Sequence, residues 1–181
     1  EQRAINAALV LTAPDGKQLV EMNLTRAGEQ ESLSLEAATA GIYRLTVRGI
    51  GVATLHGSYR LEAAVQAIAT APDRMRLTAE ALLLEANQLS KQAGKTAPQV
   101  IEKSEQALLL WKELSEPRWS ALSLRMIGTA YYDLSQFEKA LVYHEQAVTT
   151  YREVKDRVGE AVALNSMGYA YSNLSRNEKA I

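Results

Sequence analysis

The side chains that could carry acid–base or metal chemistry are few in this sequence and lie far apart. There are two histidines, His56 in a glycine-bearing loop and His144 at an apolar helical position, and no cysteine. A metal or acid–base site needs several convergent groups. Glu145 is next to His144 in sequence, but adjacent residues on a helix point apart. We therefore interpret His144 as a packing residue and His56 as a solvated loop residue.

The acidic residues do not form a catalytic pattern either. Three pairs of carboxylates lie close in sequence: Glu113 with Glu116, Glu153 with Asp156, and Asp133 with Glu138. We expect the first two pairs at solvated helix ends and the third on either side of a turn, with no opposing carboxylate. The sequence also lacks a Walker loop, a GxGxxG motif and an HExxH motif. It therefore predicts a chain that is not an enzyme, with no catalytic residues, no cofactor and no metal site.

Composition and charge narrow the classes of partner. The chain has 181 residues, of which 47% are hydrophobic and 23% charged, and its net charge is −1. Residues 1–71 hold six Lys or Arg and seven Asp or Glu, and residues 72–181 hold fourteen of each. Neither part is basic enough to predict a nucleic-acid or anionic-membrane surface, and no apolar run approaches the roughly 18 residues of a membrane span. The lack of cysteine leaves the compartment, cytoplasmic or extracytoplasmic, undecided.

A repeat of forty residues organises the C-terminal part of the chain. Residues 121–141 and 161–181 are identical at ten of their twenty-one aligned positions. The shared positions are Ala121/Ala161, Leu124/Leu164, Gly128/Gly168, Ala130/Ala170, Tyr131/Tyr171, Leu134/Leu174, Ser135/Ser175, Glu138/Glu178, Lys139/Lys179 and Ala140/Ala180. A fixed period of this length predicts stacked helix pairs.

The spacing within one repeat predicts two helices that pack closely. A first apolar stripe at i, i+3, i+4 and i+7 ends at Leu134-Ser135, and a second stripe begins after Gln136. The stripes are Leu124, Ile127, Gly128 and Tyr131, then Ala140, Tyr143, His144 and Ala147. A glycine inside a helix costs about 1 kcal/mol relative to alanine. We therefore expect Gly128 and Gly168 to lie where a neighbouring helix approaches closely.

The two copies of this motif resemble the tetratricopeptide repeat (TPR) family. The matching elements are Leu124-x-x-Ile127-Gly128-x-x-Tyr131 with Ala140 and Ala147, and Leu164-x-x-Met167-Gly168-x-x-Tyr171 with Ala180. The resemblance implies a helical solenoid that serves as a protein–protein interaction scaffold. Because the period is longer than the 34 residues usual for the family, each helix should be longer by about a turn.

Residues 1–71 show a period of two instead. Short alternating runs centred on residues 8–12, 20–24, 33–35, 43–47 and 59–65 predict about five strands. Pro14 and Gly16 predict the first turn, and Ala40-Gly41 predicts another. The predicted class is α+β in separate domains: a small antiparallel β-sandwich or sheet, followed by the TPR-like solenoid.

Two segments of the N-terminal part, 41–47 and 57–62, resemble the closing strands of bacterial pre-peptidase C-terminal β-sandwich domains. Such domains are larger than 70 residues, so this resemblance implies that the sandwich is partial and that the chain begins within a domain.

The helical part is expected to contain three repeat units. Pro72 marks the change of pattern, Gly94 should stop the first helix, and Thr96 is the expected cap of the second. Residues 72–115 form a degenerate unit, 116–155 a complete one, and 156–181 a truncated one with its second helix just begun. Because a single unit cannot bury its apolar face alone, we expect a longer array, or self-association through the surface near Tyr171, Ala180 and Ile181.

The TPR resemblance also implies a binding surface. In such a solenoid the first helix of each pair lines the concave side. The residues on that side, away from the apolar stripe, are Arg125, Thr129, Tyr132, Asp133, Asn165, Tyr169 and Asn173. Asparagine amides pair with a peptide backbone and tyrosine provides contact area at a low entropic cost. The expected partner is therefore a protein, bound through an extended peptide or a helix.

Two other functions remain open at this point. The region 57–181 is similar to the N-terminal regions of bacterial proteins that end in a caspase-like CHAT peptidase domain, which would make this scaffold the regulatory part of a larger enzyme. No catalytic residue transfers from that family, because its cysteine has no counterpart here. A surface- or carbohydrate-binding β-domain is the third alternative, but its only aromatic candidates, Tyr43 and Tyr59, fall on inward-facing positions.

Overall fold

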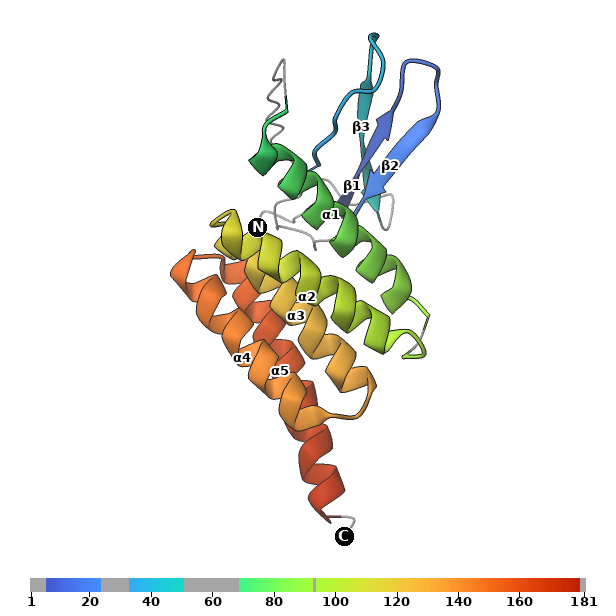
Figure 1. Cartoon of the computed structure of the whole chain (residues 1–181). Helices are drawn as coiled ribbons and strands as arrows, with labels where there is room; N and C mark the ends of the chain where they lie inside the picture. Colours follow the sequence, from blue (N-terminus) through green and yellow to red (C-terminus); the bar gives the residue numbers. More distant parts are fainter. Residues whose placement is uncertain (1–5, 24–32, 51–68, 93, 180–181) are drawn as a thin grey trace, which may run out of the picture. The chain divides into compact units, whose positions relative to one another are not determined.

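In the computed structural model, a small antiparallel sheet precedes five helices (Figure 1). The structure describes residues 6–23, 33–50, 69–92 and 94–179. Contacts divide the chain into two compact units, 1–74 and 75–181, and each unit is described by itself. The α+β class expected from the sequence is confirmed.

The sheet has three strands in the order β2-β1-β3, all antiparallel: β1 Asn6–Thr12, β2 Gln18–Met22 and β3 Arg44–Ile50. The predicted first turn is confirmed. Gly16 adopts a φ of 87° and its N–H donates to the Ala13 carbonyl at 3.0 Å. In register, Leu11 lies between Val20 and Leu45, and Leu9 lies between Met22 and Val47. These residues therefore share one apolar face, as the period of two predicts.

The prediction of a strand at residues 33–35 is wrong, because 33–37 run without regular structure and 38–41 bend before β3. Alternation of Leu and Ser specifies two faces, but a strand also needs a partner for its backbone groups. The predicted strand at 59–65, including Tyr59, and the loop with His56 lie outside the described residues, as does the 57–62 half of the second resemblance. Tyr43 precedes β3 and is partly buried, and its hydroxyl donates to the Thr39 carbonyl at 3.0 Å.

The helices are α1 Ala71–Ser90, α2 Ala97–Glu113, α3 Pro117–Asp133, α4 Phe137–Glu153 and α5 Arg157–Lys179. From α2 onward they start every twenty residues, at 97, 117, 137 and 157. Each of α2, α3 and α4 contacts the next helix in sequence, and α3 also touches α5. Such short connections make neighbouring helices antiparallel, so α3 and α5 run in the same direction (Figure 1).

The three connecting turns have the same geometry, which accounts for the even spacing. Ser115, Ser135 and Lys155 have φ values of 55°, 58° and 58°. In the middle turn, Ser135 N–H donates to the Tyr132 carbonyl and Gln136 N–H to the Tyr131 carbonyl, and the flanking turns repeat both bonds twenty residues away. This is the Schellman arrangement, which satisfies the last carbonyls of a helix. The predicted helix end at Leu134-Ser135 is confirmed.

The turn between α1 and α2 differs from the others. Gly94 adopts a φ of 76°, but α1 has already ended at Ser90. Thr96 does not cap α2 as expected: its hydroxyl donates instead to the Leu89 carbonyl at 2.6 Å, which ties the turn back to α1. A hydroxyl near a helix end can bond either flanking segment, and here the preceding helix provides the acceptor.

The core of the helical unit lies along both sides of α3. Towards α4, a buried cluster joins Leu124 and Ile127 to Ala147, Val148 and Tyr151. On the other side, a second cluster joins residues of α1 and α2 to α3: Ala86, Ala97, Val100 and Ala130. Leu122 of α3 is buried as well. Consequently α3 is enclosed on two sides.

The last helix departs from the expected repeat. The second helix of the truncated unit was expected to start after Ser175, but α5 continues without a break to Lys179, past the ends of the other helices in Figure 1. A left-handed serine costs roughly 1–2 kcal/mol, and at Ser135 the packing of α4 onto α3 offsets this cost. No such packing exists at Ser175 within the described residues, so the continued helix is favoured. Ala180 and Ile181 lie outside the described residues.

Candidate functional site

The candidate site lies on α3 and α5, which are joined by a direct side-chain contact. The Asn173 amide nitrogen donates to the Tyr132 hydroxyl at 2.9 Å and to the Tyr169 carbonyl at 2.9 Å. The Tyr132 ring also packs against Phe137, with centroids 5.5 Å apart. Both Tyr132 and Asn173 are partly buried. These two predicted site residues are therefore brought together, and they are held in place by the fold.

Three of the remaining predicted residues face solvent. Tyr169 is 58% exposed, and Asn165 and Thr129 are exposed as well. The Thr129 hydroxyl donates to the Arg125 carbonyl one turn earlier, at 3.0 Å, so one of its hydrogen-bonding directions is already used. Tyr169 and Asn165 lie one turn apart on α5, and they present an aromatic ring and an amide to solvent.

Asp133 lies at the end of α3 beside the turn that precedes α2. A Cβ atom at Gly94 would lie 3.7 Å from the Asp133 carbonyl oxygen. Partial burial of its carboxyl group raises the pKa of Asp133 above the ordinary value, although the residue as a whole is exposed. The structure thus places Asp133 next to the α1–α2 turn, and no contact between it and the α5 residues is found in the described part of the chain.

Arg125 differs from the other predicted site residues, because it is buried. Only 9% of it is exposed, and its Nε atom has no hydrogen-bond partner among the described residues. None of the ion pairs found in the described part of the chain involves Arg125. An unpaired buried charge is costly, which sets Arg125 apart from the exposed residues Asn165 and Tyr169.

Next to Arg125 lies His144, whose ring covers Gly128. A Cβ atom at Gly128 would come within 2.8 Å of the His144 Cε1 and Nδ1 atoms. The histidine is 1% exposed, and its Nδ1 atom has no partner among the described residues. Burial, and secondarily the positive charge of Arg125, lower the pKa of His144 to about 4. The imidazole is therefore neutral at pH 7 and acts as a flat packing group.

The acidic residues expected at solvated helix ends are in part structural. Asp156 lies 2.9 Å from Arg118, and its carboxylate accepts the Gly159 N–H at 3.0 Å. Its side chain is only 7% exposed, so this residue caps α5. Glu116 lies 2.7 Å from Arg76. Within the described residues, no group of three or more His, Asp or Glu side chains could hold a metal ion.

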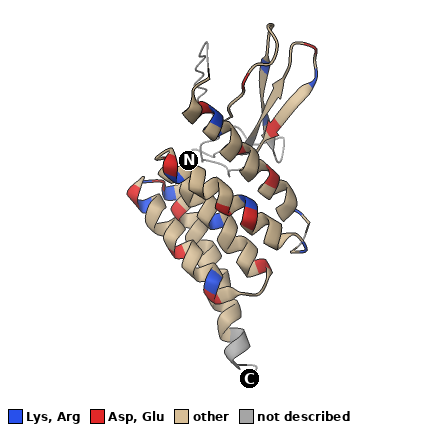
Figure 2. Ribbon diagram, viewed as in Figure 1, with Lys and Arg blue, Asp and Glu red and all other residues tan. Residues whose placement is uncertain are grey.

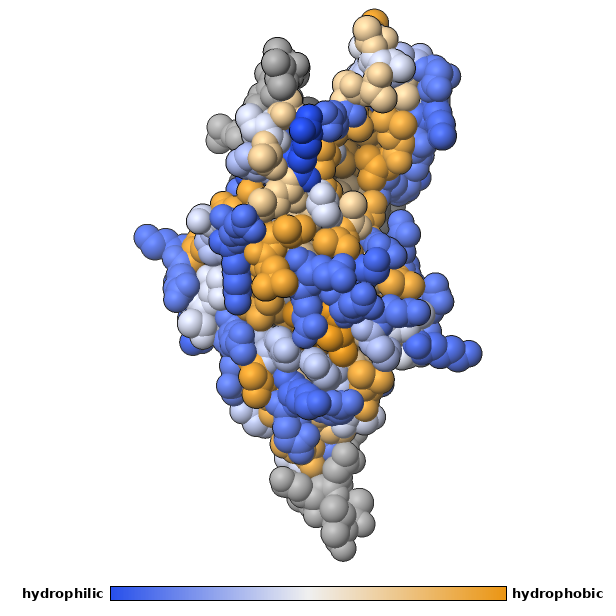
Figure 3. Space-filling model, viewed as in Figure 1, coloured by the Kyte–Doolittle hydropathy of each residue, from blue (hydrophilic) through white to orange (hydrophobic). Residues whose placement is uncertain are grey.

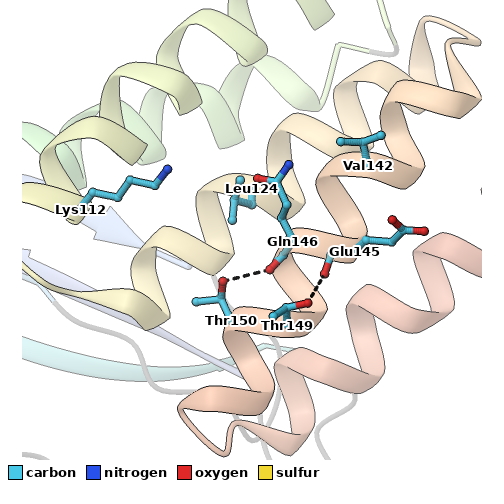
Figure 4. A pocket seen from close by; sticks show the side chains of 7 residues that line it. All are labelled: Lys112, Leu124, Val142, Glu145, Gln146, Thr149 and Thr150. Atoms are coloured by element: carbon cyan, nitrogen blue, oxygen red, sulfur yellow. Dashed lines mark hydrogen bonds between the residues drawn. The ribbon is translucent and has the colours of Figure 1, made fainter.

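A pocket on another side of the helical unit was not anticipated from the sequence. It has a volume of about 520 Å³ and is lined by residues of α2, α3 and α4: Lys112, Leu124, Val142, Glu145, Gln146, Thr149 and Thr150. Figure 4 shows Lys112 reaching from α2 towards Leu124 and Gln146. The hydroxyls of Thr149 and Thr150 donate to the Glu145 and Gln146 carbonyls, and the side chains of Lys112, Glu145 and Gln146 supply the other polar groups of its lining.

The surface of the helical unit is mixed in character. Figure 2 shows acidic and basic residues interspersed over the helices, and on the face in Figure 3 apolar side chains reach the surface between hydrophilic ones. None of the helices in the described part of the chain has both the length and the apolar content needed to cross a bilayer. When the chain is compared with known proteins, no family model and no curated protein matches it.

Proposed function

We propose that this chain is a non-catalytic interaction scaffold of TPR-like helix pairs, which binds an acidic peptide segment or helix of a partner protein along α3 and α5. The helix starts at a constant interval and the equivalent turns support the repeat assignment. The observation that carries the proposal is Arg125, a buried guanidinium that has no acidic partner among the described residues.

The neighbours of Arg125 suit a peptide ligand. Asn165 occupies the position forty residues later on the parallel helix α5, and Tyr169 follows one turn further along. A carboxylate of the ligand would pair with Arg125 through charge-assisted hydrogen bonds, an amide of the ligand backbone would pair with Asn165, and Tyr169 would add apolar contact. Asn173 and Tyr132 are already bonded to each other, so they act as the wall of this surface.

The test is direct titration of the chain with labelled peptides by fluorescence polarisation. One pool carries a central glutamate and the matched pool carries glutamine at the same place. We expect the glutamate pool to bind more tightly, and Arg125→Met to remove the difference while retaining the fold, because methionine keeps the aliphatic volume without the charge. Asn165→Ala should weaken both pools.

Thr149→Ala, on the pocket side of α4, is the matched control and should leave peptide binding unchanged. If neither pool binds, or if Arg125→Met binds the glutamate pool as tightly as the unmodified chain, the proposal is wrong. If the glutamate pool binds as expected, a pull-down from native lysate that compares the unmodified chain with the double variant Arg125→Ala/Asn165→Ala would identify the natural partner.

A further inference from the structure

We infer that α5 carries a second docking surface, distinct from the Arg125 surface, that accepts an amphipathic helix with the residue pattern of α4. The surface consists of Leu164, Gly168 and Tyr171, which lie on one stripe of α5 at i, i+4 and i+7. The inference depends on the equivalence of α3 and α5, not on the proposed function.

On α3 the same stripe is covered for the most part by α4. Leu124 is 4% exposed, and Gly128 is so close to the His144 ring that it could not carry a Cβ atom without displacement. Tyr131 stacks on Tyr143 with ring centroids 5.3 Å apart and planes 17° apart. A leucine, a glycine and a tyrosine at this spacing thus form the seat for one helix.

On α5 the identical residues have no cover within the described part of the chain. Leu164 is 42% exposed and Tyr171 is 49% exposed. Nothing lies within 4 Å of a Cβ atom placed on Gly168. The expectation that Gly168 touches a neighbouring helix is therefore wrong within the described residues. A glycine inside a helix costs about 1 kcal/mol, and no close helix contact in the described part of the chain accounts for it at this position.

The opposite side of α5 packs against α4. Ala163 and Ala170 are fully buried. Ala170 packs with Ala140 and Leu141 of α4, and Met167 and Leu174 pack against the same cluster. Thus α5, like α3, packs against the helix that precedes it. The two helices differ on the other side, where α4 covers α3 and no described residue covers α5.

The equivalence specifies the chemistry of the occupant. On α4, the residues that cover α3 are a tyrosine over Tyr131, a flat ring over Gly128, and a small residue, Ala147, one turn later. Helix-in-groove recognition uses anchors at i, i+3, i+4 and i+7, and close approach over a glycine requires a flat or small side chain. The occupant is therefore a helix that carries an aromatic residue, a flat ring and a small residue at the spacing of Tyr143, His144 and Ala147.

The sequence of α4 is itself the best probe, because α4 is seen on the equivalent surface. A labelled synthetic peptide of residues 136–156 is titrated into the full 181-residue chain and followed by fluorescence anisotropy. We expect saturable binding, reduced by about tenfold or more in Gly168→Trp. This variant should fold normally, since the space around Gly168 is open and tryptophan favours a helix more than glycine does.

Two matched controls separate this surface from the others. Thr149→Ala, on the pocket side of α4 and outside the α5 stripe, should bind the α4 peptide like the unmodified chain; a peptide with Ala147→Arg should not bind. Because Arg125→Met is not expected to affect the α4 peptide, loss of glutamate-peptide binding and loss of α4-peptide binding are independent outcomes.

Three results would overturn the inference. The first is no binding of the α4 peptide. The second is equal binding to Gly168→Trp, which would mean that the peptide displaces α4 from α3 or binds elsewhere. The third is a concentration-dependent dimer in sedimentation experiments that Gly168→Trp abolishes and that excludes the peptide, which would make a second copy of this chain the occupant.

Discussion

At the scale of single residues, two glycines with the same sequence context have opposite surroundings. Gly128 lies under the His144 ring, whereas Gly168 is open. The motif therefore identifies where a helix is accommodated, but each glycine's effect on stability depends on whether that helix is present.

This contrast gives a paired prediction. Gly128→Ala should lower the free energy of unfolding by about 1–3 kcal/mol, because the added methyl group overpacks the buried ring by more than the gain in helix propensity. Gly168→Ala should raise the free energy of unfolding by about 1 kcal/mol, since only the propensity changes. Urea denaturation followed by circular dichroism measures both. A gain in both variants would show that His144 moves aside freely.

His144 gives a prediction about pH. Its pKa is about 4 in the folded chain and about 6.5 when unfolded, so the unfolded chain binds a proton first as the pH falls. The stability contributed by the neutral imidazole is complete above pH 6.5 and is lost between pH 6.5 and 4. The loss is of order 3 kcal/mol. His144→Phe keeps a flat ring without a titrating group, and it should show a smaller fall in unfolding free energy between pH 7 and pH 4.5. An equal fall in unfolding free energy in the unmodified chain and in His144→Phe would contradict the lowered pKa of His144.

At the scale of elements, the repeated turns impose the spacing of the helices. Ser115, Ser135 and Lys155 all adopt left-handed backbone conformations, which are unfavourable for residues other than glycine. Packing between consecutive helices maintains these turns, so the turn residues are sites where local preference and tertiary structure disagree.

The second paired prediction follows from this disagreement. Ser135→Gly should stabilise the chain by about 0.5–1 kcal/mol, because glycine tolerates the left-handed conformation and this gain exceeds its extra entropy in the unfolded state. Ser175→Gly, at the equivalent position of the continuous helix α5, should destabilise it by up to about 1 kcal/mol. Thermal unfolding of both variants provides the measurement. Stabilisation by Ser175→Gly would indicate that α5 turns at this position in solution.

At the scale of the whole molecule, the sheet and the helical unit are stabilised by different kinds of contact. In the sheet, local turn chemistry at Gly16 and pairing through β1 define the register. An ion pair between Glu21 and Arg48 joins the two outer strands across β1. In the helical unit, residues forty apart repeat the same contacts: Trp111 stacks on Trp119 with centroids 5.5 Å apart, and Tyr151 lies directly over Gly159. Tyr151 thus takes the place of Trp111, and Gly159 takes the place of Trp119. The tyrosine ring fills the space above the glycine.

The helical spacing could be predicted from the sequence because it is a local property. Apolar stripes at i, i+3, i+4 and i+7 located the helices, and the boundary at Ser135 followed from the break in that pattern. The turn at Gly16 was predictable for the same reason, since proline and glycine restrict the backbone directly. The composition also sufficed to expect no membrane-spanning helix.

What only the tertiary structure decided is which surfaces have partners. Residues 33–35 alternate like a strand but pair with no strand in the described part of the chain, and Ser175 matches Ser135 but lies inside a helix. Arg125 was expected on an accessible surface, yet only 9% of it is exposed. The physical reason is common to all three: periodicity determines the direction of a side chain from its own backbone, whereas burial and pairing depend on segments distant in sequence.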